Sequence, residues 1–184
     1  MSLSGQQWCS RFPNSSDPDT LAEPFRTNAK RFLAALKAAG ATVKIAATRR
    51  SKERAWLMHY AWRIAREGLY LAVVPQLEGV DIQWIHPTLK DSYAAAEAMV
   101  KAYGIVHRPA LTSRHIEGRA IDMNIVFQSC LKIARADGAI IKIGYEVSSA
   151  YVDGNKSPEL HAVGASYGVH KLVSDPPHWS EDGR

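Results

Sequence analysis

Two short stretches of the sequence carry side chains that could bind a metal ion. The first is Ser113-Arg-His-Ile-Glu-Gly-Arg-Ala-Ile-Asp122, with an imidazole near its start and a carboxylate at its end. The second is Asp175-Pro-Pro-His178, in which two prolines stiffen the backbone between an acid and an imidazole. A stiff connection of this kind favours a site that is organised before any ligand binds.

His115, Asp122 and His178 make up a possible ligand set for zinc. Imidazole nitrogen and carboxylate oxygen bind zinc at about 2.0 to 2.2 Å, and a catalytic zinc has three protein ligands and one open position for water. We expect an extended run before a turn at 117–118 and a second extended run after it. Side chains alternate along a strand, so Ile121 and Met123 would face the core, and Asp122 would lie on the other face, where it can meet His115.

The same residues resemble the M15 family of peptidoglycan peptidases, which includes zinc D-alanyl-D-alanine carboxypeptidases and dipeptidases and phage L-alanyl-D-glutamate endolysins. The family pattern Ser-x-His-x-x-Gly-x-Ala-x-Asp is met at every fixed position from Ser113 to Asp122. The later acid-x-x-His pattern is met by Asp175 and His178. The resemblance implies zinc ligands at His115, Asp122 and His178. It also implies that Asp175, where many members have glutamate, is the general base that takes a proton from the attacking water.

A weaker match covers Thr-Arg-Arg-Ser at residues 48–51, which resembles the Thr-Tyr-Arg-Ser stretch of the family. Arg50 falls at the family arginine, and Arg49 replaces the tyrosine. The role implied for Arg50 is to hold the substrate carbonyl or carboxylate and to stabilise negative charge in the transition state. Ser113 and Arg114 are candidates for contact with the substrate, although a hydrogen bond that supports the turn would explain Ser113 equally well.

Apolar periodicity and capping residues predict the elements that position these side chains. Helices are expected over residues 20–40, 51–68 and 91–104, the first beginning at a capping box of Thr20 and Glu23. The buried stripe predicted for the second helix is Ala55, Met58, Trp62 and Ala65. Strands are expected over residues 42–47, 111–115, 120–127, 139–143 and 170–173, and the family resemblance places a glycine-rich turn at 164–168.

Helices followed by strands predict an α+β domain in which helices pack on an antiparallel sheet. The resemblance implies the zinc fold shared by D-Ala-D-Ala peptidases and the hedgehog signalling domain. At 184 residues, the chain is expected to be a single domain over residues 1–184, with residues 1–18 as a surface arm or loop. The two cysteines, Cys9 and Cys130, are expected to be free thiols.

The net charge of +5 favours polyanionic partners such as nucleic acids or bacterial envelope polymers. The basic residues are scattered among acids, so we expect no nucleic-acid partner. We expect a monomer with no transmembrane segment and no signal peptide, made in the cytoplasm.

The function expected is that of a zinc peptidase similar to bacteriophage endolysins. It would reach the cell wall in the periplasm after release and cut the peptidoglycan stem peptide, with the L-Ala-D-Glu bond favoured. The alternatives are a D-Ala-D-Ala carboxypeptidase and a non-catalytic module of the same fold that binds the cell wall.

Overall fold

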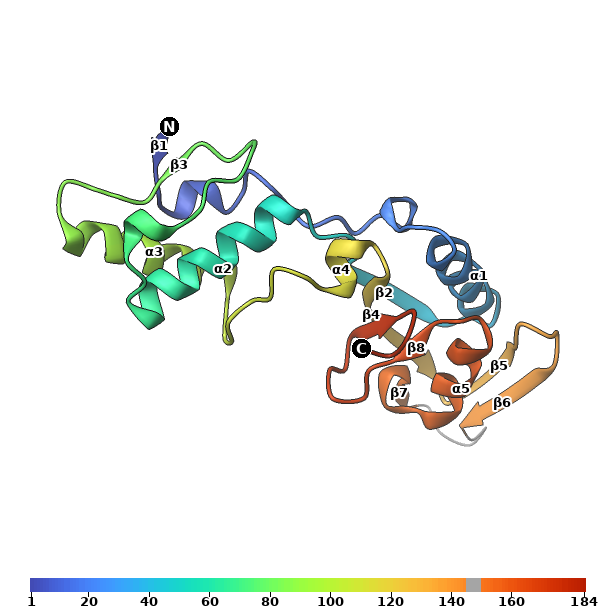
Figure 1. The fold of residues 1–184 in the computed structure, drawn as a ribbon. Coiled ribbons are helices and arrows are strands. Elements are labelled where there is room, and N and C mark those ends of the chain that lie inside the picture. Colours follow the sequence, from blue (N-terminus) through green and yellow to red (C-terminus); the bar gives the residue numbers. More distant parts are fainter. Residues whose placement is uncertain (145–149) are drawn as a thin grey trace. The chain divides into compact units, whose positions relative to one another are not determined.

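The computed structural model describes residues 1–144 and 150–184 and divides into two compact units (Figure 1). Unit 1 comprises Met1–Asn14 and Arg50–Ile116, and unit 2 comprises Ser15–Arg49 and Glu117–Arg184. Each unit is described by itself. None of the helices in the described residues combines the length and the apolar character needed to cross a membrane.

Unit 1 is built around two helices, α2 (Lys52–Glu67) and α3 (Leu89–Tyr103). Ser51 and Thr88 cap their N-termini through side-chain oxygens, and each helix ends at a glycine in the left-handed conformation. Two short parallel strands, β1 (Ser2–Leu3) and β3 (Ile82–Gln83), pair with each other. Its short elements include the 3-10 turns Gln6–Trp8 and Leu71–Val73.

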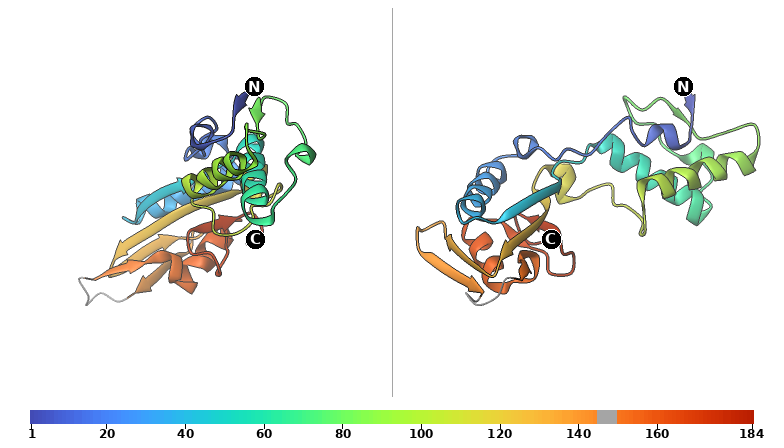
Figure 2. Two further views of the ribbon diagram at one scale, coloured as in Figure 1. Left: turned by 90° about the vertical axis from the view of Figure 1, so that its left-hand side faces the viewer. Right: turned by 180° about the vertical axis from the view of Figure 1, so that it is seen from behind.

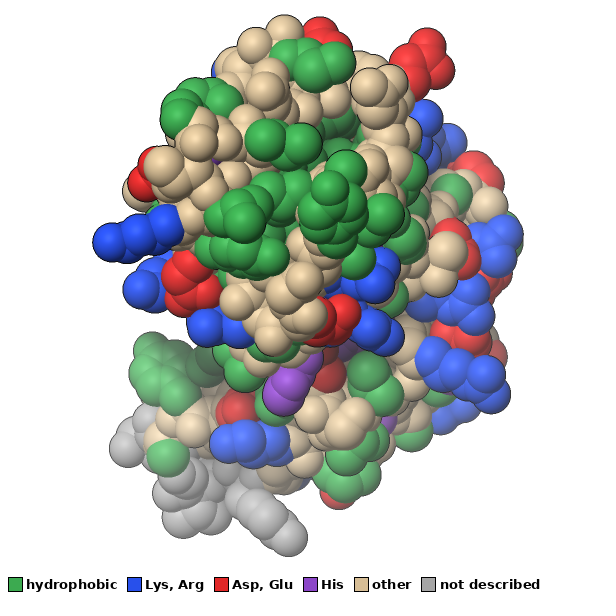
Figure 3. All heavy atoms as spheres, turned by 60° about the vertical axis from the view of Figure 1, so that its left-hand side comes forward, with side chains coloured by type: hydrophobic (Ala, Val, Ile, Leu, Met, Phe, Trp, Pro, Cys, Tyr) green, Lys and Arg blue, Asp and Glu red, His purple; other side chains and the backbone are tan. Residues whose placement is uncertain are grey.

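The core of unit 1 is rich in large aromatic side chains. It includes Trp8, from the segment expected as a surface arm, together with Trp56, Leu57, Tyr60, Ala61, Ile64, Trp84, Met99 and Val100. Large apolar side chains also remain on the surface of this unit, and Figure 3 shows hydrophobic side chains gathered on the face it presents. Tyr70, Val73, Leu89 and Val106 are among the exposed ones.

Unit 2 contains the main sheet, in the order β2 (Thr42–Ala47), β4 (Ala120–Gln128), β9 (His178–Ser180) and β8 (His170–Lys171), with β7 (Tyr151–Asp153) also paired to β4. All of these pairings are antiparallel. A separate hairpin joins β5 (Cys130–Ala134) to β6 (Ile140–Gly144). The 3-10 turns Pro18–Thr20 and Gly154–Lys156 complete the unit with two helices, α1 (Phe25–Ala38) and α5 (Pro158–Ser166).

One continuous core holds unit 2 together. The inward side chains of β4, which are Ile121, Met123, Ile125 and Phe127, are at most 2% exposed and pack with those of α1 and α5. Figure 2 shows α1 beside the strands of this sheet. Trp179 of β9 is fully buried in the same core and contacts Phe32 of α1, with ring centroids 5.5 Å apart. The packing of Trp179 beside a predicted zinc ligand therefore fixes β9 from its core side.

The α+β class with antiparallel sheets is confirmed, as are the strand at 42–47, the helices at 51–68 and 91–104, and the free thiols of Cys9 and Cys130. The predicted start of the first helix is wrong. Thr20 donates its hydroxyl to the Asp17 carbonyl, and Glu23 instead accepts from the backbone N–H of Thr27, so α1 begins at Phe25. Thr20 thus stabilises a 3-10 turn, and Glu23 stabilises the start of α1 further along the chain.

Two further predictions for the second half are wrong. Residues 111–115 are not a strand, because Arg114–Glu117 forms the short helix α4. Residues 164–168 are not simply a turn, because Gly164 lies inside α5. This helix begins where the Ser157 hydroxyl accepts from the backbone N–H of Leu160 and Pro158 takes the first helical position. The strand expected at 170–173 covers only His170–Lys171.

Candidate metal centre

Asp122 and His178 are brought together by the pairing of β4 with β9. In this antiparallel register Asp122 lies opposite His178, and Ile121 lies opposite Trp179. Side chains directly opposite each other point to the same face of a sheet. The core takes Ile121 and Trp179, so the polar pair lies on the other face, where His178 Nδ1 is 3.1 Å from Asp122 Oδ1. The predicted orientation of Asp122 away from the core is thereby observed.

His115 lies in α4, three residues before Gly118, the turn residue that leads toward β4. The Ser113 hydroxyl accepts a hydrogen bond from the backbone N–H of Ile116 at 3.3 Å, which supports the start of this single helical turn. Gly118 then takes a left-handed conformation with φ of 72°. A Cβ added there would lie 3.0 Å from the backbone nitrogen of Ala22, so both the turn and the space favour glycine.

His115, Asp122 and His178 form a cluster whose potential ligand atoms all lie within 4.8 Å of one another. His115 is 6% exposed and His178 is 8% exposed, so both imidazoles are largely removed from bulk water. The ligand atoms of a tetrahedral zinc with bonds near 2.1 Å are about 3.4 Å apart. The spacing and the donor types of the cluster therefore fit a metal ion.

The hydrogen bonds of His178 provide a second test of this fit. Its Nε2 lies 3.1 Å from the main-chain oxygen of Arg184, while its Nδ1 faces the Asp122 carboxylate. A main-chain oxygen can only accept, so the short contact assigns the proton to Nε2. The Nδ1 lone pair and the carboxylate then face each other, and a cation or a second proton must lie between them. A metal-binding histidine commonly donates its other N–H to an outer acceptor in this way.

The pKa of His178 is shifted by the same surroundings. Burial of the imidazole opposes its protonation, but the hydrogen bond to Asp122 and the negative charge of that carboxylate outweigh it. The Arg184 oxygen and the charge of Asp175 act in the same direction. The pKa of His178 is therefore raised above its usual 6.5. Protons and a metal ion would compete for the same nitrogen.

Asp175 lies outside the ligand cluster, in the loop that leads to His178 at the start of β9. Its carbonyl accepts from the backbone N–H of His178 at 3.0 Å, which closes a turn around the two prolines. Asp175 is exposed, whereas His178 is buried. The turn thus presents an accessible carboxylate next to a buried imidazole.

Lys171 stabilises this loop through hydrogen bonds to its backbone. Its ammonium group donates to the backbone carbonyls of Leu172, Asp175 and His178. Burial lowers the pKa of Lys171, against the opposing charges of Asp175 and Asp122. No periodicity or metal-ligand spacing marks this lysine, and the sequence reasoning missed it.

Arg50 and Arg114, the two arginines proposed for substrate contact, both flank His115. The backbone N–H of Arg50 donates to the carbonyl of His115 at 3.1 Å, so their main chains are adjacent. Arg50 is half-buried, and Arg114 is the first residue of α4 and also half-buried. Ser113 has the supporting hydrogen bond that was the alternative to substrate contact.

Other histidines bond elsewhere. His59 contacts the Pro109 carbonyl, His86 the Ser4 hydroxyl and His161 the Asn155 carbonyl. Among the residues that the structure describes, the cluster around His178 is the group of three that could hold a metal ion.

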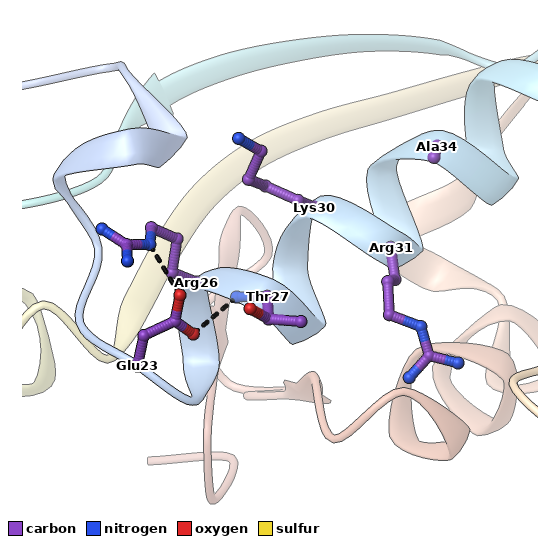
Figure 4. Close-up of a pocket in the computed structure, with 6 residues that line it drawn as sticks. All are labelled: Glu23, Arg26, Thr27, Lys30, Arg31 and Ala34. Atoms are coloured by element: carbon purple, nitrogen blue, oxygen red, sulfur yellow. Dashed lines mark hydrogen bonds and ion pairs between the residues drawn. The ribbon is translucent and has the colours of Figure 1, made fainter.

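A hollow on the surface of α1 contains none of the cluster residues (Figure 4). It is lined by Glu23, Arg26, Thr27, Lys30, Arg31 and Ala34. Arg26 is paired with Glu23 inside it at 2.8 Å, so part of its positive charge is neutralised.

Comparison with known proteins gives no independent identification. No family model matches the chain, and no curated protein matches it. The geometry of the cluster and the residue patterns around it carry the functional argument.

Proposed function

We propose that this protein is a zinc-dependent peptidase that hydrolyses an amide bond in the peptidoglycan stem peptide, with the L-Ala-D-Glu bond as the favoured site. The observation that carries the proposal is the convergence of His115, Asp122 and His178 within 4.8 Å. The sequence patterns around these residues resemble those of a peptidase family with this activity. The basic net charge of +5 suits an anionic cell-wall environment.

His115, Asp122 and His178 would hold the metal. Two imidazoles and one carboxylate form a three-ligand set of the kind that catalytic zinc sites use, in contrast to the all-oxygen sites of magnesium or calcium. A bound zinc ion would supply a Lewis acid and lower the pKa of a water molecule to about 7.

Asp175 would act as the general base. Its exposed carboxylate lies outside the ligand cluster, which leaves it available to accept a proton from water and return it to the leaving amine. The backbone turn to His178 and the Lys171 ammonium hold the loop that carries it. A base held by rigid backbone needs little reorganisation during the reaction.

Arg50 would bind the substrate carbonyl and stabilise the developing negative charge. Its main chain is fixed to that of His115, and a guanidinium offers donors in a rigid fork. Arg114 would line the approach of the peptide, and Ser113 would support the helical turn that carries His115. The place of action, on the wall in the periplasm after release, stays a prediction from the sequence.

The test is to incubate the purified protein with a synthetic stem peptide and identify the products by mass spectrometry. Cleavage between L-Ala and D-Glu that stops with a chelator and returns with zinc is expected. The Asp175→Ala variant should lose cleavage and keep its zinc. Release of terminal D-Ala would indicate the carboxypeptidase instead.

The same experiment, with a measurement of binding to peptidoglycan, tests the alternative that the protein is a non-catalytic module that binds the cell wall. Retention of the protein on insoluble peptidoglycan, with no product from any stem peptide, would refute the peptidase and favour that alternative.

A further inference from the structure

We propose that residues 180–184 form a clasp whose main-chain oxygen, at Arg184, positions the His178 imidazole for metal binding, with Ser180 as the residue that closes the clasp. This inference rests on the proposed zinc site and names residues that act on it through His178. None of them matches a ligand or a base in the sequence patterns.

Ser180 and Arg184 form a closed ring of hydrogen bonds. The Ser180 hydroxyl donates to the Arg184 oxygen at 2.9 Å and accepts from the Arg184 backbone N–H at 3.0 Å. Ser180 is fully buried, so water does not replace these bonds in the folded chain. The ring fixes both the position and the direction of the Arg184 main chain.

The turn between these two residues is also held. Gly183 has φ of 77°, which a residue with a side chain rarely adopts. Asp182 accepts from the backbone N–H of Arg184 at 3.3 Å. Glu181 bonds through its backbone N–H to the Arg119 carbonyl at 3.0 Å and through its carboxylate to the Arg119 guanidinium at 3.4 Å. The clasp is therefore attached to the residue that precedes β4.

The clasp acts on one nitrogen of one ligand. The Arg184 oxygen lies 3.1 Å from His178 Nε2, and the opposite nitrogen faces Asp122. An acceptor on Nε2 keeps the proton there and leaves Nδ1 as the metal-binding atom. The His178 imidazole is then held from two sides, by the pairing of β9 with β4 and by the clasp. Outer partners of this kind are typically worth about 10- to 100-fold in metal affinity.

The test compares zinc affinity, measured by competition with a chromophoric chelator, in four proteins. These are the wild type, Ser180→Ala, a chain shortened by residues 182–184, and the control Ser166→Ala. Ser166 also makes two hydrogen bonds through its hydroxyl, to the Val163 carbonyl and from the Ala136 N–H, but it lies in α5 away from the cluster. We expect zinc affinity to fall about 10- to 100-fold in the first two variants and to stay unchanged in the control.

A spectroscopic readout separates positioning from general stability. In the zinc-loaded wild type, an NMR spectrum of the histidine side-chain N–H groups should show a slowly exchanging His178 Nε2–H. That signal should weaken or shift in Ser180→Ala and in the shortened chain, and it should persist in Ser166→Ala. The shortened chain keeps the test decisive if Ser180→Ala fails to fold.

The outcomes distinguish the clasp from the peptidase. Folded variants that bind zinc as tightly as the wild type, with an unchanged Nε2–H signal, would overturn the clasp even if the wild type cleaves stem peptide. Weakened zinc binding in the variants, with no cleavage by the wild type, would support the clasp and overturn the proposed function. A wild-type chain that takes up no zinc would overturn both.

Discussion

Replacing Lys171 by methionine should loosen the loop that contains Asp175 and leads to His178 at the start of β9. The ammonium group donates to three carbonyls, at 2.6 Å to Asp175, at 3.0 Å to His178, and to Leu172. Methionine keeps most of the chain volume and removes the charge and every donor. The substitution therefore tests the hydrogen bonds rather than the packing.

The cost can be bounded from the geometry. A hydrogen bond to a charged group contributes about 1.5 to 3 kcal/mol, so a simple sum over three would give about 4.5 to 9 kcal/mol. That sum is too large, because each carbonyl keeps a backbone partner. Leu172 accepts from the N–H of Asp175, Asp175 from that of His178, and His178 from that of Leu172. The ammonium also loses hydration, as its lowered pKa indicates. We expect a net loss of about 2 kcal/mol, close to one such bond.

Thermal unfolding of the metal-free protein measures this loss. About 2 kcal/mol corresponds to a decrease of about 4 to 8 °C in Tm for a chain of this size. Zinc affinity should fall about tenfold, because part of the binding free energy must then order the loop. The control is Lys132→Met, at an exposed position on β5. If Lys171→Met matched the control in both Tm and zinc affinity, the reasoning about the loop would be refuted.

Three further predictions concern the site and the core. Asp122→Asn should weaken zinc binding by at least about 100-fold in a chelator competition, since a ligand contributes more than an outer partner; an unchanged affinity would remove Asp122 from the site. Because the pKa of His178 is raised in the metal-free fold, its stabilising contribution is complete below its usual 6.5 and is lost as the pH rises through the raised pKa. The difference in Tm between metal-free wild type and His178→Ala, measured from about pH 5 to about pH 9, should therefore shrink as the pH rises, and a difference that stays constant or grows would contradict the assignment. Gly164→Ala places a Cβ 2.7 Å from Trp179 Cζ3 and 2.8 Å from the Val169 carbonyl, and should cost about 1 to 3 kcal/mol in chemical denaturation. An unchanged denaturation midpoint would show that the core there can relax.

Capping residues and apolar periodicity were sufficient to predict where α2 begins and ends, but not which side of it is buried. Ser51 and Gly68 bound α2 as predicted, and Ala55 of the predicted stripe is buried, but the other three positions of the stripe were predicted one residue too late. Leu57, Ala61 and Ile64 are fully buried, whereas the prediction placed the same spacing at Met58, Trp62 and Ala65. One residue turns a helix by about 100°, so a wide apolar surface does not reveal which part of it meets the core.

The candidate site was partly accessible to sequence reasoning because its ligands lie in short patterns. The helical turn at His115 was missed, although Ser113 is a residue type that caps helices. The helix α5 also carried a readable start in Ser157 and Pro158. The pairing of β9 with β4, and the contacts of Lys171 and Ser180, join residues through tertiary folding, so no local pattern could reveal them.

A zinc titration of the metal-free protein, with cleavage of a synthetic stem peptide as the readout, tests whether zinc bound by His115, Asp122 and His178 is required for cleavage. Cleavage should be absent without metal, should rise in proportion to added zinc, and should reach a plateau at one zinc per chain. His178→Ala should show no such rise. Cleavage that proceeds in the metal-free protein, or a titration that reaches saturating zinc without product, would show that zinc at this site does not catalyse the reaction.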